Sequence, residues 1–174
     1  MDSDEDRPEK TVITGSDDLL ADDHLRLPES ASPLVRLHAI RAWLTRRQKE
    51  TSLEIGMAAL DWQHLEEDEP ATLSLRRRER EERAERIQQS RQRIQDEQQR
   101  LSTYEEATDL LEECVNHVTV GERLLVEYYL MLEELVQNEQ QKDPTQSAAP
   151  GPRLQALLDV QHRVEHVGIP GEED

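Results

Sequence analysis

Hydrophobic residues recur every three or four positions along most of this chain, a spacing that places them on one face of an α-helix. The first such stripe lies within residues 32–66 and consists of Leu37, Ile40, Leu44, Ile55, Trp62 and Leu65. Ser32 and Pro33 favour a helix start, because the hydroxyl accepts a hydrogen bond from a free amide and the proline ring supplies the helical φ. Pro70 ends the helix. We therefore predict a helix over 32–66 and a turn at 67–71.

A second and much longer helix is predicted over residues 72–141. The apolar residues that its first part turns towards the shorter helix are Ile87, Ile94 and Leu101. Beyond them a strict heptad spacing begins, which is typical of coiled coils and helical bundles. A break at 118–121 and an uninterrupted helix both stay open, because the β-branched residues and the glycine of this stretch lower helix propensity.

The heptad seam over residues 104–136 is the strongest apolar surface in the sequence. Its candidate interface residues are Tyr104, Leu111, Cys114, Val118, Leu125, Tyr128, Leu132 and Leu135. In an antiparallel hairpin about Pro70, residues equally distant from the turn face each other, so Leu37 is expected to face Arg100. A first helix of about 50 Å then covers only the nearer half of a second helix of about 105 Å. The seam would then project beyond the hairpin, and so large an exposed apolar area is unusual for a monomer. We therefore predict that neighbouring helical subunits cover it.

The two ends of the chain differ from its helical middle. Residues 1–31 carry ten acidic groups and few apolar ones, so we expect a disordered acidic tail. Residues 142–152 form a linker rich in Pro, Ser and Ala, and residues 167–174 form an acidic tail. Between them lies a short amphipathic helix over 153–166, which either docks on the bundle or recruits a partner. Its apolar face consists of Leu154, Leu157, Leu158 and Val164. The predicted fold is all-α, an extended helical hairpin or coiled coil with a short tethered C-terminal helix.

Composition favours extended helices over a compact domain. Of the 174 residues, 34% are hydrophobic and 3% aromatic, with no Phe, so few large side chains are present to fill a core. The net charge of −18 disfavours nucleic acid and anionic membranes as partners. No segment approaches the roughly 20 apolar residues of a membrane span, so no membrane insertion is expected. The single cysteine and the lack of a signal-peptide pattern indicate an intracellular protein, cytoplasmic or nuclear and not secreted.

Two motifs carry candidate chemistry. His162, Glu165 and His166 follow the H-x-x-E-H order of inverzincin metalloproteases, but only eight residues remain beyond them and no downstream ligand fits there. The arginine-rich segment 76–86 contains interleaved acids that cancel much of its field. A better basic face lies on the first helix and consists of Arg36, Arg41, Arg46, Arg47 and Lys49. Because no nucleophile and base, phosphate loop or two-carboxylate cleft is recognisable, we predict a non-enzymatic protein without cofactor or metal.

In composition and helical pattern the chain resembles small coiled-coil subunits of kinetochore, centrosomal or ciliary, and vesicle-tethering assemblies. That resemblance implies a scaffold or adaptor that acts by helix–helix association. Residues 102–141 hold ten acids against Arg123 alone, so a parallel homodimer would set acids beside acids. Other helical subunits, in a hetero-oligomer, are therefore the favoured partners, and an antiparallel arrangement is also acceptable. A nuclear or chromatin-associated regulatory adaptor is the alternative, and direct nucleic-acid binding is a third, less favoured one.

Overall fold

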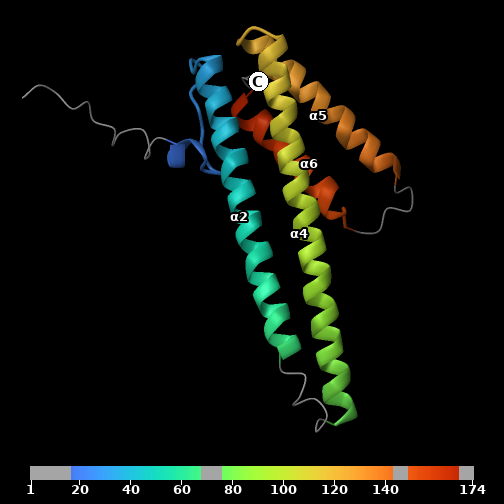
Figure 1. Ribbon diagram of the computed structural model, residues 1–174. Helices are drawn as coiled ribbons and strands as arrows, with labels where there is room; N and C mark the ends of the chain where they lie inside the picture. The colour runs from blue at the N-terminus through green and yellow to red at the C-terminus, as the bar shows by residue number, and fades with distance from the viewer. Residues whose placement is uncertain (1–16, 68–75, 143–148, 169–174) are drawn as a thin grey trace, which may run out of the picture.

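The computed structural model describes residues 17–67, 76–142 and 149–168, and every regular element in these ranges is helical. The three long helices are α2 (Pro33–Glu67), α4 (Arg77–His117) and α5 (Glu122–Lys142). A shorter helix, α6 (Pro152–Arg163), continues into one π-helical turn, η1 (Val164–Gly168). Helices α2 and α4 run side by side, α5 folds back beside the upper part of α4, and α6 packs against both α4 and α5 (Figure 1). The predicted all-α class is thus confirmed.

Local signals in the sequence account for most of the helix ends. The Ser32 hydroxyl accepts a hydrogen bond from the Val35 amide at 3.3 Å, as expected of an N-cap. At the start of α4 the Arg76 amide donates to the Glu79 carboxylate at 2.9 Å. The other end of α4 is set by Val118, whose extended backbone (φ −123°, ψ 135°) cannot continue the helix.

Of the two alternatives that the sequence left open for residues 118–121, the structure has the break, so the segment predicted as one helix over 72–141 forms α4 and α5. Arg76, which lies inside the predicted helix, has extended backbone, and α4 begins at Arg77, so the predicted start is too early. Residues 68–75, which include most of the predicted turn at 67–71, lie outside the described residues. The break falls at residues 118–121, where β-branched side chains and Gly121 make helix least favourable. This break allows α5 to turn back onto α4 instead of extending away from it.

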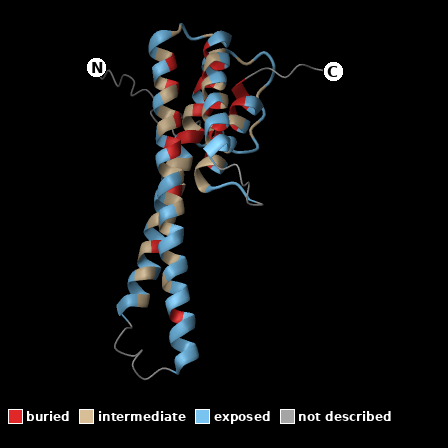
Figure 2. Ribbon diagram, turned by 90° about the vertical axis from the view of Figure 1, so that its right-hand side faces the viewer, coloured by how far each residue is buried: buried red, intermediate tan, exposed pale blue. Residues whose placement is uncertain are grey.

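Two regions of different thickness result, which we name the head and the arm. The head comprises residues 17–50, 101–142 and 149–168, and the arm comprises residues 51–67 and 76–100. Apart from the junction, where Arg100 donates a hydrogen bond to Gln155 of α6, the arm consists of α2 and α4 alone. Buried residues gather in the head, whereas the arm is mostly exposed or half-buried (Figure 2). The head core consists of residues from four helices and η1, among them Leu37, Ile40, Leu44, Leu111, Leu125, Tyr128, Leu132, Val160 and Val164.

The antiparallel register of α2 and α4 differs from the one predicted for a tight turn. Arg41 forms a two-pronged ion pair with Glu112, both N–O distances being 2.7 Å, and the Gln48 amide donates to the Thr108 hydroxyl at 2.8 Å. Leu37 therefore lies near the end of α4 and does not face Arg100. The shift follows partly from the position of Arg77, which begins α4 well beyond the predicted start. Consequently α2 covers the C-terminal part of α4, which includes the first half of the predicted seam.

The predicted disordered tail over 1–31 is wrong for residues 17–31, which form a strap across the head; residues 1–16 lie outside the described part. Leu20, Leu25 and Leu27 of this N-terminal strap pack against the core. The buried Arg163 guanidinium donates hydrogen bonds to the backbone carbonyls of Leu20 and Asp22, each at 2.7 Å. Arg36, also buried, donates to further strap carbonyls. Composition alone misses such ordering, because the donors come from distant parts of the chain.

The C-terminal helix docks on the head, which resolves the alternative that the sequence left open. Residues Ala156, Leu157, Val160, Val164 and Val167 are all fully buried. Gly168 ends η1 where a Cβ atom would come within 3.1 Å of the Ile40 side chain, so only glycine allows this approach without a shift. Residues 167 and 168, placed in the predicted acidic tail over 167–174, are thus buried in the head; residues 169–174 and linker residues 143–148 lie outside the described part.

Candidate protein-interaction surface

The head encloses the residues predicted to bind a partner subunit. Tyr104, Leu111, Cys114, Leu125, Tyr128 and Leu132 are all at most 4% exposed, and Val118 and Leu135 are partly buried. The expectation that this seam is bare in a single molecule is wrong, because α2, α5 and α6 of the same chain cover it. The need for another chain at this seam therefore disappears.

Polar atoms within the seam are also satisfied by the chain itself. The Tyr128 hydroxyl donates to the Ala107 carbonyl at 2.8 Å, and burial raises the Tyr128 pKa. The Tyr104 ring meets Trp43 edge to face with 6.0 Å between ring centroids. Burial, together with the nearby Asp159 carboxylate, raises the pKa of Tyr104 to about 12. Both phenols thus stay protonated and belong to a closed core.

The residues predicted to make hairpin contacts divide between the two regions. Leu37, Ile40 and Leu44 lie in the head core at 1% exposure or less. The others remain only half-buried between the helices, namely Ile55, Trp62, Leu65, Ile87, Ile94 and Leu101. In the arm, the Arg91 guanidinium stacks 5.3 Å from the Trp62 ring. Two helices are too few to enclose these side chains, so the arm is held by partial contacts and by ion pairs such as Arg93 with Glu54.

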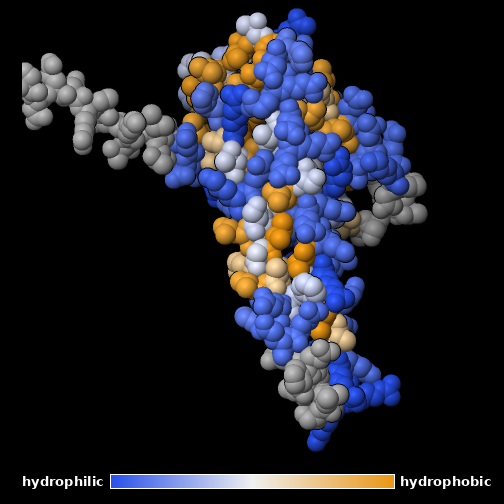
Figure 3. All heavy atoms as spheres, viewed as in Figure 1, coloured by the Kyte–Doolittle hydropathy of each residue, from blue (hydrophilic) through white to orange (hydrophobic). Residues whose placement is uncertain are grey.

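A second apolar row lies on the outer side of the arm, and the sequence reasoning missed it. Leu53 is 69% exposed, and Met57 and Leu60 are each 57% exposed. Their spacing of four and three residues puts them on one face of α2, roughly opposite the buried Ala58, which faces α4. We call these three residues the outer row. Figure 3 shows hydrophobic surface along the arm below the head. The signal was present in the sequence as a second helical repeat beside the stripe of Ile55 and Trp62.

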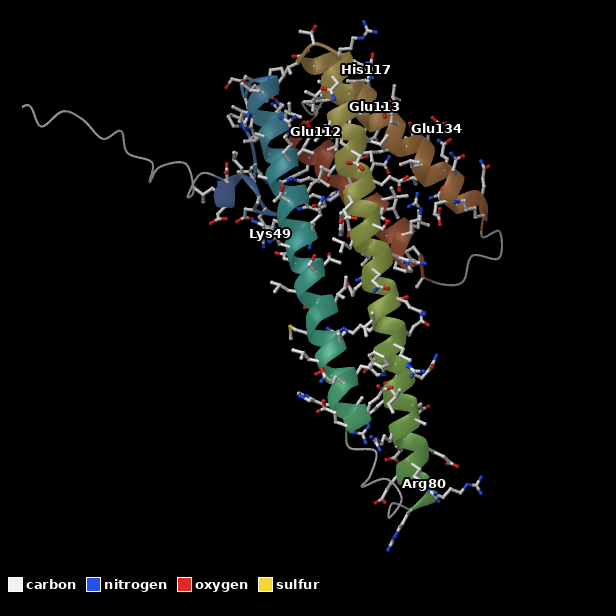
Figure 4. The ribbon with its side chains drawn as sticks, in the orientation of Figure 1. Lys49, Arg80, Glu112, Glu113, His117 and Glu134 are labelled. Carbon is white, nitrogen blue, oxygen red and sulfur yellow. The ribbon has the colours of Figure 1, made fainter. Side chains whose placement is uncertain are left out.

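Charged groups border the outer row at both of its ends. Lys49 lies one turn before Leu53, on the side of α2 away from α4 (Figure 4). Glu67 lies two turns after Leu60 and accepts a hydrogen bond from the Gln63 amide at 2.7 Å. Beside the row, a shallow groove of about 480 Å³ separates α2 from α4 and is lined by Asp61, His64, Leu65, Arg86, Gln89, Ser90 and Arg93. The arm thus offers a surface that is apolar in its centre and charged at its ends.

The other sequence motifs are engaged within the head or gather no ligand set. Glu165 accepts a hydrogen bond from the Tyr129 hydroxyl at 2.6 Å, while His162 and His166 stack on the surface with 6.2 Å between their centroids. Among residues 17–67, 76–142 and 149–168, no three His, Cys, Asp or Glu side chains are placed to hold a metal ion. Burial raises the pKa of the Cys114 thiol, which lies in the head core.

The basic face predicted on the first helix is largely neutralised by the chain itself. Arg36 is buried against backbone carbonyls, and Arg41 is paired with Glu112. Arg46 and Arg47 both bond to Glu50, which leaves Lys49 as the member of this group without an ion pair among the described residues. The face therefore offers much less free positive charge than the sequence indicated.

No family model, curated protein sequence or solved structure matches this chain. None of the described helices is both long and apolar enough to cross a membrane. Within the part of the chain that the structure describes, the outer row of the arm is the longest run of exposed large apolar side chains on one helix face. In the head, α5 carries the pair Val126 and Leu130 at 44% and 54% exposure.

Proposed function

We propose that the protein is a non-enzymatic adaptor subunit of a multiprotein assembly, and that it acts by helix–helix association through the arm. The observation that carries this proposal is the exposure of Leu53, Met57 and Leu60 on a helix whose opposite face is already packed. Three large apolar side chains in a row on one helix face are typical of anchors for another amphipathic helix. These three side chains do not stabilise the head, because none of them belongs to the head core.

The size of the effect agrees with a partner surface of limited strength. Covering one exposed Leu or Met side chain is worth about 1–2 kcal/mol at these exposures. Three of them give only a few kcal/mol, which the entropy of association largely offsets. Additional contacts along the groove beside Leu65 and Arg86 are therefore needed for specific binding. The α2 part of the arm extends about 25 Å beyond the head, which is long enough to supply them.

The division into head and arm favours the structural role expected from the helical pattern. The head is a self-contained fold, and the arm carries a surface away from it, as suits a subunit of a kinetochore, centrosomal or ciliary, or vesicle-tethering assembly. This assembly type is inferred from shape and helical pattern, and the same geometry serves any assembly built from helical subunits. Direct nucleic-acid binding is less favoured, since arginines of the basic face on α2 already bond to Glu50, Glu112 and backbone carbonyls of the same chain.

Site-specific crosslinking in cells tests this role. A photo-crosslinking amino acid replaces Met57 in the full chain, and in a matched control it replaces Leu130, an equally exposed apolar residue of the head. We expect crosslinks from position 57 that map to a helical segment of a protein, and few from position 130. Equal yields from both positions, or none from position 57, would refute an arm-mediated adaptor role.

A further inference from the structure

We propose that the outer row of the arm binds the same row of a second copy of this chain, with the two α2 helices antiparallel. This inference rests on the proposed function, because it names the first partner of the same surface. Two-fold symmetric interfaces require a patch whose two halves complement each other. The outer row and its flanking charges on α2 have this property.

The apolar residues are nearly symmetric about Met57. In an antiparallel pair centred there, Met57 meets Met57 of the second copy, and Leu53 of each chain meets Leu60 of the other. Each helix thus inserts its apolar side chains between those of its neighbour, the usual packing of antiparallel helices. Gly56, at the edge of the row, has no atom within 4 Å of an added Cβ, so open space for a second backbone adjoins the row.

The charges at the ends of the row have opposite signs, and the same pairing brings them together. Lys49 of one chain falls opposite Glu67 of the other, and the symmetry repeats this contact. Neither group forms an ion pair among the described residues of its own chain. Glu67 moreover ends α2 at the negative end of the helix dipole, where a carboxylate is unfavourable and a cation from a second chain relieves it.

The other flank of the row accepts the same arrangement. Asp61 of one chain approaches Glu50 and Glu54 of the other, which at first suggests repulsion. Both glutamates are already paired inside their own chain, Glu50 with Arg46 at 2.6 Å and Glu54 with Arg93. Asp61 therefore meets two neutralised ion pairs, and the contact costs little.

Longer-range charge also selects the antiparallel direction. Parallel arms would set the two acid-rich heads side by side, whereas antiparallel arms keep them at opposite ends. The tip of one arm then reaches the N-terminal strap of the other copy, which carries exposed Asp17 and Asp18. At this tip lies Arg80 (Figure 4), which has no ion pair among the described residues. Opposite charges thus meet at four points along the proposed pair, because the symmetry repeats both kinds of contact.

The interface is small, so the expected dimer is weak. Two helices that overlap for about 30 Å reach the lower end of specific interface sizes, for which we expect a dissociation constant on the order of 10 µM. Sedimentation velocity of the purified full chain from about 1 to 500 µM should therefore show a monomer that becomes a dimer. A chain that stays monomeric over this range while fully helical would overturn the inference.

Substitutions separate the proposed pair from other dimers. Met57→Asp places two carboxylates together on the symmetry axis and should weaken dimerisation at least 30-fold, while the matched head variant Leu130→Asp should leave it unchanged. Lys49→Glu and Glu67→Lys should each weaken the dimer several-fold. The double variant should restore it, because a glutamate and a lysine then face each other again at both contacts. Circular dichroism checks that helicity is retained. Dimerisation that persists in Met57→Asp, or a double variant weaker than both single ones, would overturn this arrangement.

The outcome also separates this inference from the adaptor role. If position 57 crosslinks in cells to residues 46–67 of the same protein, the second copy is the partner. If the purified chain remains monomeric and position 57 crosslinks instead to a helix of a different protein, the adaptor role stands and the second copy is excluded.

Discussion

The head and the arm share the same two helices and nearly the same apolar spacing, yet they bury their apolar side chains to very different extents. In the head, α2 and α4 meet α5 and α6, and Leu44 and Leu111 are fully covered. In the arm the two helices have only each other, and Ile55 and Ile94 stay half-exposed. Helical periodicity therefore indicates which residues share a face, while the number of neighbouring helices decides whether that face is closed. The most apolar seam of the sequence, over residues 104–136, is therefore the one that the fold buries most completely.

The largest expected effect contrasts a core leucine of the head with an isoleucine of the arm. Leu132→Ala should lower the free energy of unfolding by about 3 kcal/mol, since it leaves a cavity at a fully buried site. Ile94→Ala should cost about 1 kcal/mol, since its side chain is only half-buried. Urea denaturation measures both. Equal losses would mean that the arm is as closed as the head.

The next effect concerns the buried arginine that holds the N-terminal strap. Arg163→Met should cost about 2 kcal/mol, because it leaves the carbonyls of Leu20 and Asp22 without their donors. Amides of residues 17–31 should then exchange faster with deuterium. The control Arg123→Met removes an exposed guanidinium of α5 and should change stability by less than about 0.5 kcal/mol. An unchanged strap in Arg163→Met would contradict its anchoring role.

Two neighbouring tyrosines of α5 give a smaller contrast within the head. Tyr128→Phe removes a buried hydrogen bond to the Ala107 carbonyl and should cost about 1 kcal/mol. Tyr129→Phe removes a bond to the surface residue Glu165 and should cost clearly less. Thermal unfolding compares the two variants. A larger loss for Tyr129→Phe would mean that Tyr129, and not Tyr128, makes the more important hydrogen bond of α5.

The smallest effect depends on pH and concerns Asp23 of the strap. Desolvation raises its pKa, but the Trp43 hydrogen bond at 2.6 Å and the charges of Arg47, Arg46 and Arg163 outweigh this and lower it. A lowered pKa contributes stability above the unfolded-state value of about 3.9, and this contribution is lost as pH falls through the folded-state pKa. Asp23→Asn should therefore lose less stability between pH 7 and pH 2 than the natural chain. Parallel acid titrations monitored by circular dichroism test this, and equal losses would contradict it.

Local sequence signals predicted the helices well and the tertiary arrangement less well. The Ser32 cap and the weak helix propensity near Gly121 were visible in the sequence, because both act through neighbouring residues. The buried roles of Arg36 and Arg163 were not visible, because each arginine bonds to carbonyls that only the fold brings close. The register of α2 on α4 depends partly on where α4 begins, and the predicted start was too early.

The location of the free surface was misplaced for the same reason. Without knowledge that α5 folds back, the segment 104–136 was the natural candidate for a partner interface. The outer row could have been recognised from the spacing of Leu53, Met57 and Leu60 alone. It was overlooked because only one stripe per helix was followed, whereas a helix that carries two apolar stripes serves two neighbours.

Hydrogen exchange of the full chain at two concentrations tests the central claim most directly. At about 1 µM, amides of residues 104–117 and 124–136 should exchange slowly and those of 51–67 quickly, because the head closes itself and the arm does not. At about 500 µM, only 51–67, the arm tip at 76–80 and the strap should gain protection, as the arms of two copies cover each other. If instead 104–136 exchanges quickly in the dilute chain and becomes protected on concentration, the seam is the interface and the outer row is not.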